Sequence, residues 1–103
     1  MFGLFNKRQI PSEVAVAFRA YQNNGVTLDR PAKLMSCFDT LGYRGTMRAL
    51  NRIVALPIGT RLTFKAVRMK GTRAWYKVRA FTTSTSGVSL TIDGWVNSVI
   101  FDI

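Results

Sequence analysis

The sequence predicts a single α+β domain in which N-terminal helices pack against a C-terminal antiparallel sheet. The chain has 103 residues, of which 48% are hydrophobic, and this length is typical of one domain with one modest core. Apolar residues follow a helical period before residue 57 and alternate after it, as in an amphipathic helix and a half-buried strand respectively. We therefore divide residues 1–103 into an N-terminal arm (1–10), a mainly helical part (11–56) and a mainly β part (57–103).

The first helix is expected over residues 13–23. Ser12 is a favourable N-cap, and Pro11 supports a helix start at this point. The apolar stripe of this helix consists of Val14, Ala17, Phe18 and Tyr21. Gly25 is expected to end the helix, because glycine adopts the left-handed conformation at little cost.

Two further helices are expected before residue 57. One covers residues 29–41, with Asp29 as its N-cap. Its apolar stripe consists of Leu34, Phe38 and Leu41. The other runs from Thr46 to about Val54 and ends before Pro57, because the residue before a proline favours extended geometry.

The β part begins with a predicted hairpin. Residues 61–68 and 73–81 each alternate between apolar and polar side chains, and a turn around Gly71 separates them. Such a pattern is typical of two antiparallel strands. On the first strand the residues expected to share the apolar face are Leu62, Phe64 and Ala66.

Two more strands are expected over residues 88–92 and 95–101. The dipeptide Asp93-Gly94 favours a turn between them. The predicted core of the whole domain consists of Phe18, Leu34, Phe38, Leu62, Phe64, Tyr76, Val78 and Val96.

Charge is the strongest functional signal. Fifteen Lys and Arg residues face five Asp and Glu residues, which gives a formal net charge of +10. This excess attracts polyanions, namely nucleic acid, an acidic protein or an anionic membrane surface. The alternative is a basic surface that only keeps the protein in solution. No apolar run approaches the roughly 20 residues of a transmembrane helix.

The chemical inventory argues against catalysis. The chain has no His, so imidazole acid–base chemistry, a serine-type triad and His metal ligation are absent. The acidic residues are scattered singly: Glu13, Asp29, Asp39, Asp93 and Asp102. The single cysteine, Cys37, forms neither an internal disulfide nor a multi-thiolate metal site, and it favours a reducing cytoplasm. We therefore expect no enzyme activity, no catalytic or metal-binding residues and no cofactor.

One face of the predicted hairpin is the main candidate site. Alternation places Trp75 on the same face as the cations Arg61, Lys65, Arg73, Lys77 and Arg79. Interleaved cations and an aromatic ring are typical of surfaces that follow a nucleic-acid backbone and stack on its bases. The alternative is that Trp75 covers the open side of the sheet and the cations only solvate it.

Three motifs within residues 56–101 resemble the bacterial SH3-like domain. They are Leu56-Pro-Ile-Gly-Thr-Arg-Leu-Thr-Phe64, Trp75-Tyr-Lys-Val78 and Gly94-Trp-Val-Asn-Ser98. Their order and approximate spacing match the "lpkGtxlxV", "WyKV" and "GWVxsxyl" strands of that family. The resemblance implies that the sheet is a small SH3-like barrel.

Another motif lies within residues 30–55, namely Phe38-Asp-Thr-Leu-Gly-Tyr-Arg-Gly-Thr-Met-Arg-Ala-Leu-Asn-Arg-Ile53. With a helix, a glycine turn and an Arg-rich helix in order, it resembles a helix-turn-helix. The hairpin at 61–81 would then be a wing. In that motif the second helix presents side chains to base edges and the wing holds phosphates. The resemblance implies that four residues of the second helix face DNA: Thr46, Arg48, Asn51 and Arg52. The alternative is an ordinary amphipathic helix with solvated arginines.

Together these features predict a non-enzymatic, strongly basic nucleic-acid-binding protein of the cytoplasm. DNA is the favoured ligand, and the features do not distinguish single-stranded from double-stranded DNA. The compact, His-free composition suits a small phage or mobile-element protein. The first alternative is an SH3-like protein-interaction or virion structural module that binds an acidic protein. The other alternative is contact with a membrane surface through Phe2, Leu4 and Phe5 of the arm.

Overall fold

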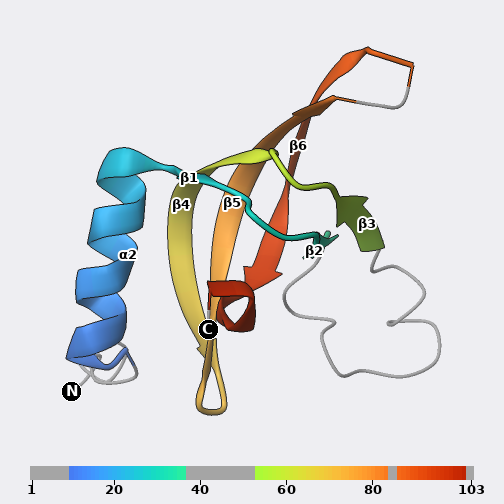
Figure 1. Ribbon diagram of the computed structural model, residues 1–103. Coiled ribbons are helices and arrows are strands. Elements are labelled where there is room, and N and C mark those ends of the chain that lie inside the picture. Colours follow the sequence, from blue (N-terminus) through green and yellow to red (C-terminus); the bar gives the residue numbers. More distant parts are fainter. Residues whose placement is uncertain (1–9, 37–52, 84–85, 102–103) are drawn as a thin grey trace, which may run out of the picture.

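The computed structural model describes residues 10–36, 53–83 and 86–101, which form an α+β fold (Figure 1). In chain order the elements are α2 (Ser12–Asn24), β1 (Val26–Thr27), β2 (Ala32–Met35), β3 (Ile53–Leu56), β4 (Arg61–Lys70), β5 (Arg73–Thr83), β6 (Ser89–Asn97) and the 3-10 helix η1 (Ser98–Phe101). The strands pair antiparallel in the order β1-β4-β5-β6-β2-β3. The sheet is open, with β1 and β3 at its edges.

Helix α2 lies close to its predicted position. It begins one residue earlier, so Pro11 is the N-cap and Ser12 is the first helical residue rather than a side-chain cap. The helix ends at Gly25, as predicted: its φ of 68° is left-handed, and its N–H donates to the carbonyl of Tyr21 at 2.7 Å. Figure 1 shows α2 alongside β4.

A cluster of aromatic rings joins α2 and η1 to the inner face of the sheet. Its members are Phe18, Tyr21, Phe64, Tyr76 and Phe101. Their ring centroids lie between 4.9 Å (Tyr21–Phe101) and 6.0 Å (Phe18–Tyr76) apart, which is the spacing of favourable aromatic pairs. This cluster fixes which face of the sheet is the core.

The core prediction is confirmed where the structure describes it. The buried predicted residues are Leu34, Leu62, Phe64, Tyr76, Val78 and Val96. Phe18 is half-buried against them, and Phe38 lies outside the described residues. The predicted hairpin is also confirmed as β4 and β5, with a turn at Gly71 whose φ is 63°.

The second predicted helix is wrong over residues 32–35, which form β2. In this strand Ala32 and Leu34 are buried and Lys33 is exposed, so the burial follows a period of two. Leu34 satisfies a helical stripe and a strand equally well, and pairing with β3 and β6 decides between them. Residues 37–41 lie outside the described part.

The third predicted helix is wrong at its C-terminal end. Ile53 and Val54 belong to β3 and pair with Met35 and Leu34 of β2. Both are β-branched, and such residues favour strands. The stretch 46–52 lies outside the described residues.

The predicted turn at Asp93-Gly94 is also wrong, because β6 runs through it without interruption. Gly94 lies beneath β2: a Cβ at this position would come within 2.7 Å of both the Leu34 Cγ and the Met35 carbonyl oxygen. A glycine inside a strand often marks such a close approach of another backbone. Here it allows β2 to pack on β6.

The last predicted strand ends early. It stops at Asn97, and Ser98–Phe101 turn into η1. The Asn97 side-chain oxygen accepts a hydrogen bond from the Val99 N–H at 3.0 Å. This local bond supports a tight turn, which brings Phe101 to the aromatic cluster.

Candidate nucleic-acid interface

A β-bulge in β4 determines which side chains reach the outer face of the sheet. The β4–β5 register skips Lys65. Because of this extra residue, every later side chain of β4 lies on the opposite face of the sheet from the one that simple alternation predicts. Ala66, predicted to lie on the core face, therefore lies opposite Lys77. Val67 and Met69 take the core side instead.

The bulge gathers cations from both strands on one surface. It places Arg68 opposite Trp75 and Lys70 opposite Arg73. We call the outer surface of β4 and β5 the basic face. Its exposed cations are Arg61, Lys65, Arg68, Lys70, Arg73, Lys77 and Arg79. Among the described residues of β4, β5 and β6, the only carboxylate is that of Asp93 in β6, which lies opposite Arg79 at the edge of this face.

Arg79 is held by that carboxylate. Its Nε donates to Asp93 Oδ1 at 2.8 Å and its Nη2 to Oδ2 at 3.3 Å. The hydrogen bond from Arg79 lowers the pKa of Asp93 below its ordinary value, and the charges of Lys77 and Lys65 act in the same direction. At neutral pH the pair is therefore fully ionised, and Arg79 is less available to an external anion.

Arg61 has a structural contact as well. Its Nη2 donates to the carbonyl of Asn24 at 3.0 Å, and its Nη1 to the Thr27 hydroxyl at 3.4 Å. These bonds tie the start of β4 to the C-terminal end of α2. The guanidinium also fills the space beside Gly25, where a Cβ would lie 2.9 Å from Nη2. Arg61 thus lies at the margin of the basic face and stabilises the fold.

The remaining predicted site residues lie together where they are described. Lys65, Arg73, Trp75 and Lys77 share the basic face, whereas Arg48 and Arg52 lie outside the described residues.

Simple alternation along residues 61–68 did not predict Arg68 and Lys70 on this face. The signal for them is present, because the apolar positions of β4 change from even (Leu62, Phe64) to odd (Val67, Met69) after Lys65. When the apolar positions of one strand shift by one residue and those of its partner strand do not, the first strand contains an extra residue, which is a β-bulge.

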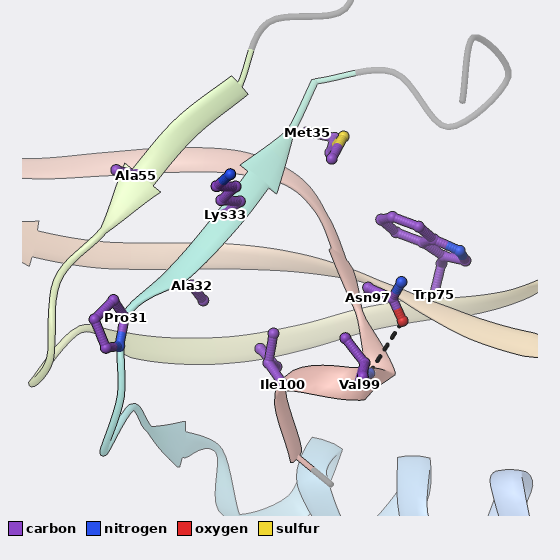
Figure 2. Close-up of a pocket in the computed structure, with 9 residues that line it drawn as sticks. All are labelled: Pro31, Ala32, Lys33, Met35, Ala55, Trp75, Asn97, Val99 and Ile100. Carbon is purple, nitrogen blue, oxygen red and sulfur yellow. Dashed lines mark hydrogen bonds between the residues drawn. The ribbon is translucent and has the colours of Figure 1, made fainter. Parts of the chain in front are cut away.

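A pocket lies at the border of the basic face (Figure 2). It has a volume of about 400 Å³ and is open to solvent. Lys33 and Met35 of β2 line one side, and Trp75 of β5, Asn97 of β6 and Val99 of η1 line the other. We call it the Trp75 pocket. The sequence could not predict it, because its walls need β2 as a strand and η1 as a turn.

The described part of the chain was compared with the requirements of a metal site and of a membrane-spanning helix. The described residues contain no group of three or more side chains that could hold a metal ion. Among them there is also no helix of the length and hydropathy that crossing a membrane requires. Comparison with family models, curated proteins and solved structures finds no match to this chain.

Proposed function

We propose that the protein binds nucleic acid without catalysing a reaction, with the phosphates held on the basic face. One observation carries the proposal: the bulged register places cations from two neighbouring strands on one surface. Among the described residues of β4, β5 and β6, Asp93 at the edge of this surface is the only carboxylate. Same-face residues of a strand lie about 6–7 Å apart and neighbouring strands about 4.8 Å apart. A phosphate backbone that crosses this surface meets several cations at once.

Positive charge is concentrated at the end of the hairpin, where Lys70 lies opposite Arg73. A surface with a cluster of charges of one sign attracts ligands of the opposite sign. This concentration supports the binding of a polyanion on the basic face.

A matched pair of charge reversals tests the proposal. Fluorescence anisotropy at low salt would compare Lys77→Glu, in the middle of the basic face, with Arg19→Glu on the exposed side of α2. Both change the net charge equally. We expect the wild type to bind labelled DNA, Lys77→Glu to lose most of that affinity and Arg19→Glu to retain it. Equal losses would show that net charge alone attracts DNA, and no binding by the wild type would refute the proposal.

The helix-turn-helix resemblance adds Arg48 and Arg52 to the proposed contacts. If that segment enters the major groove, these arginines read base edges while the basic face holds phosphates. The single cysteine also favours a cytoplasmic location, where nucleic acid is accessible.

A second candidate is binding of an acidic protein by an SH3-like module. It is supported by the positions of the three SH3-like motifs: one runs from the end of β3 into β4, one lies in β5 and one ends β6. The same cations would contact the partner. An acidic polypeptide such as polyglutamate that binds the wild type more tightly than DNA does at the same salt would favour this candidate.

A further inference from the structure

The Trp75 pocket combines apolar walls with one polar group of fixed orientation, the side-chain amide of Asn97. The apolar part of the lining includes the Trp75 ring, the Met35 thioether and the Val99 and Ile100 side chains. Trp75 is only half-buried, so its ring is accessible to a ligand. Such a mixture of aromatic, apolar and few polar groups is typical of sites for small flat ligands, and about 400 Å³ lies within the usual range of roughly 300–1,000 Å³.

Asn97 gives the pocket hydrogen-bonding specificity. Its side-chain oxygen is occupied by the Val99 N–H, and this bond fixes the orientation of the carboxamide. The amide nitrogen consequently points away from Val99 (Figure 2). An amide nitrogen is a hydrogen-bond donor, so the pocket favours a ligand with an acceptor on the edge of a flat ring.

The surroundings of the pocket indicate that this ligand is attached to an anion. Trp75 belongs both to the pocket and to the basic face, where Arg68 lies opposite it on β4. Lys77 lies two residues further along β5, opposite Trp95 of β6. Lys33 lines the pocket from β2. A group that enters here therefore has cations on both sides of its point of attachment.

We propose that the Trp75 pocket receives one unstacked base of a single-stranded nucleic acid whose phosphates run along the basic face. This inference rests on the proposed function and specifies its substrate. A nucleotide is flat and apolar at its base, carries acceptors at the base edge and is anionic at its backbone. In a duplex the bases are stacked inside the helix, so a duplex would contact the basic face alone. Single strands gain the additional stacking on an aromatic ring.

Three labelled probes separate the pocket from the basic face: a deoxythymidine decamer, a decamer of abasic nucleotides and a short duplex. The abasic strand carries the same charge as the thymidine strand but offers no base. Two variants alter the pocket, because Trp75→Ala removes the ring and Val99→Trp fills the cavity. Their matched controls are Ile58→Ala and Val16→Trp, at positions that are 63% and 70% exposed and outside the pocket. Circular dichroism melting would confirm that each variant is folded.

We expect both pocket variants to weaken binding of the thymidine decamer by about five- to 150-fold, the range for one base stacked on an aromatic side chain. Binding of the abasic strand and of the duplex should stay within about twofold of wild type, and the two controls should bind all three probes normally. Val99→Trp serves as the test if Trp75→Ala proves unstable.

The failures of the two proposals are distinguishable. If Val99→Trp binds the thymidine decamer as tightly as the wild type, or if the thymidine and abasic strands bind the wild type equally, the pocket receives no base. The basic face would then still account for binding to all three probes. If none of the probes binds the wild type at low salt, the proposed function and this inference both fail.

Discussion

At the scale of single residues, the cations of the basic face are not equivalent. Arg79 is paired bidentately with Asp93, and Arg61 is bonded to the end of α2. Both were expected from sequence to contact the ligand in the same way as Lys65 and Lys77. Alternation predicts the face on which a cation lies, but it does not predict a carboxylate on the neighbouring strand that occupies the cation.

Asp93 is therefore expected to weaken binding, and its removal should strengthen it. In Asp93→Asn, Arg79 loses its ionic partner and becomes available to a phosphate. We expect tighter binding to duplex DNA and a log–log dependence on salt that is steeper by up to about 0.9, the contribution of one phosphate. Asp29→Asn is the control, because it changes net charge equally at a residue that pairs with Arg30 away from the face. Weaker binding by Asp93→Asn would contradict the assigned role of the pair.

The same pair has a defined pH dependence. Hydrogen bonding to Arg79 lowers the folded-state pKa of Asp93 below the ordinary value of 3.8. The stability that the pair contributes is thus present above that ordinary value and is lost as the pH falls through the lowered pKa. The charges of Arg79 and Asp93 do not change near neutral pH. Any pH dependence of nucleic-acid binding in that range would therefore have another cause.

At the scale of secondary-structure elements, local pattern predicted the hairpin and most of β6, but it predicted neither β2 nor the continuity of β6 through Asp93 and Gly94. The hairpin strands are neighbours in sequence, and their turn and alternation are both local signals. In contrast, β2 is a strand because of its pairing with β3 and β6, which lie far away in the chain. Local pattern also fails at Gly94. Its tendency to form a turn is outweighed by the close packing of β2, which lies far away in the chain.

Gly94 should consequently be intolerant of a side chain. In Gly94→Ala the new Cβ meets the Leu34 side chain and the Met35 carbonyl oxygen at 2.7 Å, and the backbone atom cannot rotate away. We expect a loss of about 1–3 kcal/mol in the free energy of unfolding, as for other overpacked sites, measured by urea denaturation. Ser89→Ala, at the exposed start of β6, should change it by less than about 0.5 kcal/mol. Wild-type stability in Gly94→Ala would show that β2 does not pack on β6 in this way.

At the scale of the whole molecule, the topology brings together residues that the sequence separates. The basic face is formed within one hairpin, which is why much of it is predictable from alternation. The Trp75 pocket combines β2, β3, β5, β6 and η1, and no local pattern connects Met35 with Trp75 or Asn97. The cations of the basic face and Trp75 beside them were thus largely predictable from the sequence, whereas the pocket walls contributed by β2, β6 and η1 were not.

The dependence of DNA affinity on salt tests the central claim most directly, because each phosphate held by a cation releases counterions. Dissociation constants for duplex DNA would be measured between about 50 and 200 mM salt for the wild type, for Lys65→Ala/Lys77→Ala on the basic face, and for Arg19→Ala/Arg30→Ala elsewhere. The two double variants lose the same charge. We predict that the basic-face variant flattens the log–log slope by about 1.8, two phosphates at about 0.9 each, and that the other variant keeps the wild-type slope. Equal slopes for the two double variants would contradict the claim that this face holds the phosphates.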